Sequence, residues 1–261
     1  MTILYDGRAV LMGKEEINLD NFPALKVIGV NMTGTEHLPW RQINERGIKV
    51  LSLIGETEFL KSVTSTSEHT IGLMLALARK YKHALSAPYG ERNAYTGHTL
   101  RGKVLGLVGC GRVSHQVADI AEAFGMKVLV YDTSMDYNVY DWATSIEVLC
   151  KKSDFVSLHI PLAENEQFFT IDMFRKMRST AYFINTSRPG IVQKGALREA
   201  LSNQYIAGAA VDFIDDLDLL SYSQITDRLI LTNHMGGNTF EDRKATEEFI
   251  LAKLNNYFQS L

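Results

Sequence analysis

Residues 100–114 read Leu-Arg-Gly-Lys-Val-Leu-Gly-Leu-Val-Gly-Cys-Gly-Arg-Val-Ser, and this stretch decides the fold. Its apolar run Val104–Val108 predicts a buried strand, and the pattern from 117 to 124 predicts a helix that follows it. Between them, Gly109 permits a tight turn, and Gly111 lets the backbone approach a pyrophosphate at the helix N-terminus. The stretch therefore predicts a strand, a phosphate-binding turn and a helix.

An acidic residue on the next predicted strand supports this interpretation. Asp132 lies 21 residues after Gly111 and ends the apolar run 127–131. A carboxylate there accepts hydrogen bonds from the adenosine ribose and repels a 2′-phosphate, so the pattern favours NAD over NADP. Taken alone, Asp132 is also typical of a turn residue that ends a strand. Ser114 stands in place of the third motif glycine, so we expect looser packing of the helix against the strand.

Short apolar runs alternate with helix-length segments along the chain. Because these runs lack polar alternation, they are typical of parallel strands covered on both faces. The pattern predicts a doubly wound, Rossmann-type α/β domain at 100–234 and a second, smaller, truncated flavodoxin-like α/β domain. We expect the second domain to comprise 1–64 and a helix at about 235–261, with 65–99 as an interdomain helix and linker. The predicted strands are Leu25–Val30, Ile48–Leu53, Val104–Val108, Lys127–Tyr131, Phe155–Ile160, Ala181–Asn185, Ile206–Val211 and Leu229–Leu231.

A helix predicted over Ser67–Arg79 is apolar almost all round past its first turn. Such a helix must be covered on every side. A symmetric partner would supply part of the cover, so homodimerisation is one hypothesis. An ordinary central helix that needs no partner is the alternative.

Polar residues follow three of the predicted strands, at the sheet edge where parallel sheets bind ligands. They are Arg188, Asp212 with Asp215, and His234. The arginine fork can hold a carboxylate or polarise a ketone oxygen, and the histidine can exchange a proton with a substrate oxygen. Singly, these residues are typical of a surface ion pair, a loop acid and a capping histidine. Together, beside a dinucleotide, they indicate hydride transfer.

Composition excludes several classes of protein. The chain has 261 residues, of which 46% are hydrophobic, and a net charge of −3, so we expect a folded protein with no nucleic-acid partner. The longest apolar run, 71–78, is too short to cross a membrane, and the N-terminus lacks the pattern of a signal peptide. We therefore expect a cytoplasmic protein with no membrane partner. Two cysteines without CxxC spacing argue against a disulfide framework and against a metal site.

Several motifs in order resemble the D-isomer-specific 2-hydroxyacid dehydrogenase family, which includes phosphoglycerate, glycerate, lactate and formate dehydrogenases. The resemblance runs from about Leu25 to the end of the chain. It implies an NAD-dependent enzyme, usually a homodimer, that interconverts a D-2-hydroxy acid and its 2-keto acid. The most specific pieces are Ser67-Glu-His-Thr-Ile-Gly-Leu-Met-Leu-Ala-Leu-Ala-Arg79, Leu100–Gly106, Ala123–Asp132, Ser153–Leu162 and Ile184–Val192.

The resemblance also implies roles for individual residues. Arg188 is similar to the arginine that binds the substrate carboxylate and carbonyl, and His234 to the acid–base histidine. Asp215 occupies the place of the glutamate that pairs with this histidine. The residues implied at the cofactor are Gly109, Gly111, Arg112 and Val113 at the pyrophosphate, Asp132, His159 and Pro161 at the adenosine, and Thr186 and Asp212 at the nicotinamide.

The implied substrate turn contains Met32, Thr33 and Gly34, whose backbone N–H groups are expected to bind the substrate carboxylate. Met32 fills a usual glycine place, which narrows the conformations available to the turn.

Other departures from the family concern the catalytic side. Asp215 is one methylene shorter than the usual glutamate, which puts its reach to His234 in question. Pro189 replaces a common glycine, fixes one backbone angle and removes an N–H. The lead before Leu25 is short, so we expect a reduced substrate lobe that positions substrate less well. A reduced substrate lobe leads to three hypotheses: slow catalysis, a larger substrate, or loss of catalysis.

Two main functional hypotheses result. The first is an oxidoreductase that transfers a hydride between NAD(H) and a small 2-keto or D-2-hydroxy acid. The alternative is a catalytically weak or inactive NAD-responsive binding protein on the same fold, similar to the C-terminal-binding-protein corepressors. A dehydrogenase of another small acid, such as formate or phosphite, is a third hypothesis.

Overall fold

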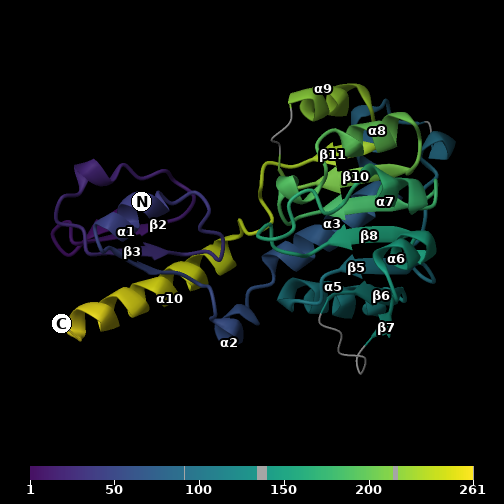
Figure 1. Cartoon of the computed structure of the whole chain (residues 1–261). Helices are drawn as coiled ribbons and strands as arrows, with labels where there is room; N and C mark the ends of the chain where they lie inside the picture. The colour runs from purple at the N-terminus through teal and green to yellow at the C-terminus, as the bar shows by residue number, and fades with distance from the viewer. Residues whose placement is uncertain (91, 134–139, 214–216, 261) are drawn as a thin grey trace. The chain divides into compact units, whose positions relative to one another are not determined.

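The computed structural model describes residues 1–90, 92–133, 140–213 and 217–260. The chain divides into two compact units, one formed by Met1–Val63 with Asn238–Leu261 and the other by Thr64–Gly237 (Figure 1). The sequence boundaries were expected at 64, 99 and 234. The segment predicted as an interdomain helix and linker lies within the larger unit, and residues 235–237 also belong to that unit.

The larger unit is built on a seven-stranded sheet in which every pairing is parallel. The strand order is β11-β10-β9-β8-β5-β6-β7, so the order reverses between β5 and β8. Such a switch point is where open parallel sheets bind ligands. The strands are β5 (Val104–Val108), β6 (Lys127–Tyr131), β7 (Asp141–Trp142), β8 (Phe155–Leu158), β9 (Tyr182–Asn185), β10 (Gly208–Val211) and β11 (Leu229–Leu231).

Helices cover both faces of this sheet, which confirms the doubly wound prediction (Figure 1). Alternate residues of β6 illustrate the two faces: Val128 and Val130 belong to one buried cluster, and Leu129 belongs to the other. The first cluster includes residues of α3 and α5, and the second includes residues of α6, α7 and α8. The helices are α3 (Ser65–Ala78), α4 (Tyr81–Ser86), α5 (Arg112–Ala123), α6 (Ile146–Lys152), α7 (Ile171–Lys176), α8 (Ala196–Ser202) and α9 (Leu217–Ile225).

Helix α3 is the apolar helix of the sequence prediction. It contacts α5, β9 and β10, and its Ile71, Met74 and Leu77 are buried within the larger unit. Much of its apolar surface is therefore covered by its own chain, as the central-helix alternative requires. Homodimerisation stays a prediction, which a mass measurement in solution tests.

The smaller unit contains a four-stranded sheet in the order β1-β2-β3-β4. Its first pair is antiparallel and the other pairs are parallel. Helix α10 packs on this sheet at Gly29, where an added Cβ would lie 2.7 Å from Ile250 and 2.8 Å from Leu254. The elements are β1 (Thr2–Leu4), β2 (Ala9–Met12), β3 (Val27–Val30), α1 (Trp40–Glu45), β4 (Lys49–Leu51), α2 (Thr57–Leu60) and α10 (Phe240–Gln259).

Short 3-10 turns complete the description, at Leu19–Asn21, Arg92–Tyr95 and Pro189–Ile191. In the part of the chain that the structure describes, no helix is both long and apolar enough to cross a membrane.

Candidate active site

The ends of six parallel strands bring the predicted residues of the larger unit to one edge of its sheet. Because all the pairings are parallel, the carboxyl ends of β11, β10, β9, β8, β5 and β6 lie at the same edge. Along this edge, in the order of the strands, lie His234, Asp212, Thr186 with Arg188, His159 with Pro161, Gly109 with Gly111, and Asp132.

The two glycines after β5 differ in what surrounds them. Gly109 has a φ of +99°, and an added Cβ would lie 2.7 Å from the carbonyl oxygen of His159. Gly111 has an ordinary φ of −85° and caps the N-terminus of α5, and an added Cβ would meet nothing within 4 Å. Gly109 is thus required by the turn itself. Gly111 leaves open space at the N-terminus of α5, and such a helix end suits a pyrophosphate.

Ser114 does not loosen the turn as expected. Its side chain is buried, and its hydroxyl donates a hydrogen bond of 2.7 Å to the carbonyl oxygen of Gly109. The serine therefore fills the place of the third glycine and bonds the first turn of α5 to the end of β5. The expectation failed because the hydroxyl has an acceptor within reach.

Asp132 lies directly against the glycine turn. One of its carboxylate oxygens accepts a hydrogen bond of 2.7 Å from the backbone N–H of Cys110. Helix α5 begins with Arg112 and Val113, the two residues that the sequence assigned to the pyrophosphate. The Arg112 guanidinium donates to Gln116, and Val113 packs against the buried cluster that includes residues of α3 and α5. Asp132 therefore holds the turn, and its contact with the ribose of a bound cofactor stays a prediction.

His159 and Pro161 follow β8. The Nε2 atom of His159 lies 2.9 Å from the hydroxyl of Ser157, and burial lowers the pKa of His159 to about 4. The imidazole is therefore neutral near pH 7. Pro161 is exposed next to it, so this segment offers an uncharged wall at the predicted adenosine side.

The loop that carries Arg188 is held by a buried amide at the end of β9. The side chain of Asn185 donates a hydrogen bond of 3.0 Å to the carbonyl oxygen of Arg188 and accepts one of 2.9 Å from the N–H of Ser187. Pro189 disfavours the helical region for the residue before it, and Arg188 is extended, with φ −139° and ψ 144°. The proline that departs from the family pattern therefore fits the backbone of the arginine.

Thr186, on the same loop, connects it to α3. Its hydroxyl lies 2.9 Å from that of Thr70, and both side chains are buried. The predicted nicotinamide side of the site thus includes α3, which sequence reasoning did not assign to it.

Asp212 is 1% exposed and accepts bonds from four donors. They are the Thr232 hydroxyl at 2.6 Å, the N–H groups of Met235 at 2.8 Å and Gly236 at 2.6 Å, and His69 Nε2 at 3.2 Å. Burial alone would raise the pKa of Asp212, but the hydrogen bonds from His69, Thr232 and the two amides outweigh it and lower the pKa to about 2. The carboxylate is therefore ionised throughout the neutral range.

His234 is exposed and follows β11 in a left-handed conformation, with a φ of +52°. Its ring makes an edge contact with Phe213, with the ring centroids 6.2 Å apart. Asp215, its predicted partner, lies outside the described residues, so this pairing stays a prediction.

The predicted substrate turn belongs to the smaller unit. Met32 follows β3, packs against the core of that unit, and accepts a bond of 3.2 Å from the N–H of Leu53. Thr33 is exposed and Gly34 is partly buried. The methionine side chain therefore anchors the turn, and substrate binding by these residues stays a prediction.

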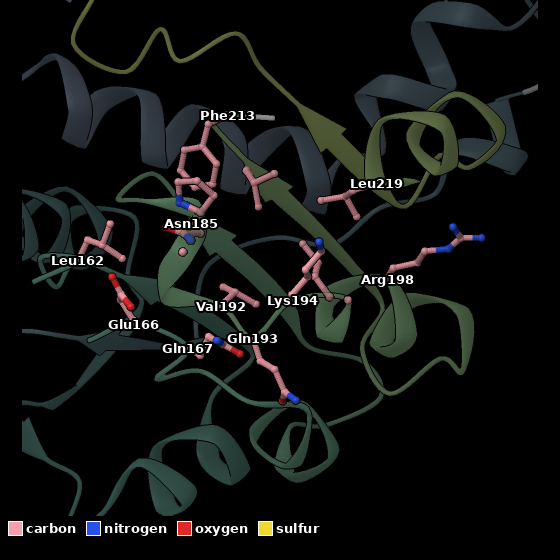
Figure 2. Close-up of a pocket in the computed structure, with 15 residues that line it drawn as sticks. Leu162, Glu166, Gln167, Asn185, Val192, Gln193, Lys194, Arg198, Phe213 and Leu219 are labelled. Atoms are coloured by element: carbon pink, nitrogen blue, oxygen red, sulfur yellow. The ribbon is translucent and has the colours of Figure 1, made fainter. Parts of the chain in front are cut away.

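A cavity of about 350 Å³ lies beside the sheet edge (Figure 2). Its walls include Leu162, Asn185, Lys194 and Phe213. Of the predicted catalytic residues that the structure describes, none lines it. The cavity reaches the ends of β9 and β10 at Asn185 and Val211, but because it lacks these catalytic residues we do not assign it to the reaction.

Sequence reasoning missed three residues around Asp212: His69, Thr232 and Gly236. His69 stands in a quoted family motif, on a helix more than 140 residues away along the chain, so spacing gave no signal for it. The signals available were two adjacent glycines after His234 and a hydroxyl residue between β11 and the histidine.

Comparisons with known proteins agree with this geometry. Residues 71–236 match the NAD-binding domain of D-isomer specific 2-hydroxyacid dehydrogenases. The glyoxylate reductase of Thermofilum pendens is 33% identical over 90% of this chain and 73% of its own. The hydroxypyruvate reductase of Thermotoga maritima is 32% identical over 84% of this chain and 73% of its own.

A solved structure has the same fold. A D-isomer specific 2-hydroxyacid dehydrogenase from Polaromonas superposes with a TM-score of 0.85 at 24% identity, over 97% of this chain and 83% of that one. The glycine turn, the open space at Gly111 and the match over residues 71–236 point to the same cofactor. The chain belongs to the D-isomer specific 2-hydroxyacid dehydrogenase family, and its cofactor is NAD.

Proposed function

We propose that this chain reduces a small 2-keto acid to the D-2-hydroxy acid with NADH, and catalyses the reverse reaction with NAD. The observation that carries the proposal is the placement of Arg188, Asp212 and His234 after the adjacent strands β9, β10 and β11. Adjacent strands lie about 4.8 Å apart, so the three loops begin close to one another at the same edge of the sheet.

Arg188 binds the substrate in this proposal. Its guanidinium is planar and always charged, so it can hold a carboxylate by two parallel hydrogen bonds or polarise the ketone oxygen. The amide of Asn185 and the ring of Pro189 fix the backbone from which it extends. The arginine can thus orient the carbonyl without a further change of the loop.

His234 gives the proton to the substrate oxygen during reduction and takes it back during oxidation. When bound, the NADH cofactor would supply the hydride for the carbonyl carbon. Because the imidazole of His234 is exposed, it can exchange its proton with solvent between turnovers.

Asp212 orients the nicotinamide in this proposal. A carboxylate offers about four acceptor positions, two on each oxygen. Oδ1 receives bonds from His69, Thr232 and Met235, whereas the contacts described for Oδ2 consist of the N–H of Gly236. Oδ2 therefore retains the capacity to accept a bond from the nicotinamide carboxamide.

The substrate class follows from the arginine and from the relatives. We propose an acid of the size of glyoxylate or hydroxypyruvate. The names of the two relatives support this choice. Both relatives are enzymes by name, so neither supports the alternative of an NAD-responsive binding protein.

The test measures the oxidation of NADH with purified protein and glyoxylate, hydroxypyruvate, pyruvate or 3-phosphohydroxypyruvate. We expect turnover with one of the small acids, and its loss in His234→Ala and Arg188→Ala. His83→Ala is the matched control, because His83 lies on α4, where its side chain is 41% exposed.

Two results would contradict the proposal in different ways. Tight NADH binding without turnover on any acid would favour the binding-protein alternative. Turnover that survives in His234→Ala would keep the class of reaction but remove His234 from its role.

A further inference from the structure

We propose that His69 is a positioning residue: by donating from Nε2 to Asp212, it fixes the turn that presents His234. The inference rests on the proposed function for the role of His234, and its structural part can be tested without turnover. All the residues involved belong to the larger unit.

The contacts of His69 indicate that its ring nitrogen Nε2 carries a hydrogen. Nε2 lies 3.2 Å from Asp212 Oδ1 and 3.2 Å from Thr232 Oγ1. The Thr232 hydroxyl donates its own hydrogen to Asp212 Oδ1 at 2.6 Å, and the carboxylate can only accept. Nε2 must therefore carry a hydrogen, which is directed at the carboxylate and the threonine oxygen together.

Asp212 in turn holds the backbone after β11. Its Oδ1 accepts from the N–H of Met235 and its Oδ2 from the N–H of Gly236, the two residues that follow His234. A Cβ on Gly236 would lie 2.8 Å from Asp212 Oδ2 and 3.5 Å from His69. Position 236 thus needs glycine so that its N–H can reach the carboxylate.

The conformation of His234 needs such support. A histidine with a φ of +52° is strained relative to an ordinary residue, and strain of this kind persists where the surroundings fix the backbone. The two residues directly after His234 donate backbone N–H hydrogen bonds to Asp212. A shift of the carboxylate would therefore move or release the loop that carries the acid–base group.

His69 is the partner that ties this carboxylate to α3. A buried carboxylate is costly unless hydrogen bonds compensate for the lost water, and Asp212 is 1% exposed. Without His69, Oδ1 keeps Thr232 and Met235 but loses its contact with the helix. The carboxylate is then free to turn or to take up water, and the amides of the turn follow it.

The experiment compares His69→Gln with His69→Leu. Glutamine keeps an N–H donor on a side chain of similar reach, and leucine removes the donor at similar volume. We expect His69→Leu to lower kcat roughly tenfold, as the loss of a hydrogen bond to a charged group predicts, with a smaller change in the KM of the keto acid. We expect His69→Gln to recover most of kcat, and His83→Gln to match the wild type.

Hydrogen exchange on the segment 232–237 provides the readout that does not depend on activity. We expect the amides of Met235 and Gly236 to exchange faster in His69→Leu than in the wild type or in His69→Gln. If His69→Leu does not fold, His69→Asn replaces it, because asparagine has the same amide on a shorter reach.

The outcomes separate the two proposals. If the wild type turns over no acid, the proposed function fails, and exchange alone decides the role of His69. Equal exchange and equal kcat in the leucine, glutamine and wild-type proteins would overturn the inference. A loss of stability alone, with kcat and exchange of the turn unchanged in the folded protein, would also overturn it, because it would leave His69 a merely structural residue.

Discussion

The two glycines of the predicted phosphate-binding turn allow a paired prediction, because their surroundings in the structure differ. Gly109→Ala places a Cβ 2.7 Å from the His159 carbonyl oxygen and 2.9 Å from Ile160, at a φ of +99°. Gly111→Ala places a Cβ in open space, at a φ of −85° that any residue adopts. The first change should damage the fold and the second the binding of NAD.

The magnitudes follow from these contacts. At Gly109, a positive φ costs alanine about 1–2 kcal/mol, and crowding against backbone costs about 1–3 kcal/mol. The free energy of unfolding should therefore fall by roughly 2–5 kcal/mol. At Gly111, alanine replaces glycine as the helix N-cap, which costs about 1 kcal/mol or less. Its Cβ would occupy the space of the pyrophosphate, so the Kd for NADH should rise by about tenfold or more, which is about 1.4 kcal/mol.

Urea denaturation measures the first effect and titration with NADH the second. We expect a clear loss of stability with Gly109→Ala and near-normal stability with weak binding for Gly111→Ala. The reasoning is refuted if Gly111→Ala binds NADH as the wild type does, because the turn then does not approach the cofactor. Wild-type stability of Gly109→Ala would show that the close approach of His159 is not as described.

Three further predictions concern other parts of the larger unit. NADP should bind much more weakly than NAD, because Asp132 lies against the glycine turn and repels a 2′-phosphate; equal Kd values in parallel titrations would contradict this. Lys82→Met should lower the free energy of unfolding by about 1–3 kcal/mol in urea, because the Lys82 ammonium donates to three carbonyls, those of Ser223, Thr226 and Leu229. The pKa of Asp212 is lowered from 3.8 to about 2, so its ionised form stabilises the fold above pH 4 by about 2 kcal/mol. This contribution should disappear as the pH falls from about 4 to 2, and Asp212→Asn should lack it in a pH series of urea denaturations.

The sequence predicted the larger unit well because its signals are local. The runs Val104–Val108, Lys127–Tyr131 and Leu229–Leu231 form strands with the expected bounds. Each is a short, β-branched or leucine-rich run, so composition and length agree on a strand. The predicted Phe155–Ile160 ends two residues earlier, at Leu158, because the chain leaves the sheet there to form the wall of the site.

Three strands were not predicted, and each lacks such a signal. β1 is three residues long with a mostly exposed surface, and β7 has two residues. β2 is fully buried, but periodicity alone does not distinguish its four apolar residues from part of a buried helix. These strands exist because they pair with neighbouring strands, which is tertiary information that a window of sequence does not contain.

The candidate site divides in the same way. Arg188, Asp212 and His234 could be predicted because each directly follows an apolar strand, and parallel strands share one carboxyl edge. His69 could not, because its contact with Asp212 depends on how α3 packs across β9 and β10. Spacing along the chain carries no trace of that packing.

The loops of Arg188 and His234 share one feature: a buried polar side chain holds the backbone beside each residue. At the end of β9, buried Asn185 bonds the N–H of Ser187 and the carbonyl of Arg188. After β10, buried Asp212 bonds the N–H groups of Met235 and Gly236 beside His234. In both cases a buried polar side chain fixes the backbone next to a residue at the edge of the sheet. Such a buried side chain must find its hydrogen-bond partners within the protein. The side chain and the loop therefore fix each other's conformation. The precision of this site therefore lies in the buried amide and carboxylate as much as in the partly buried arginine and the exposed histidine.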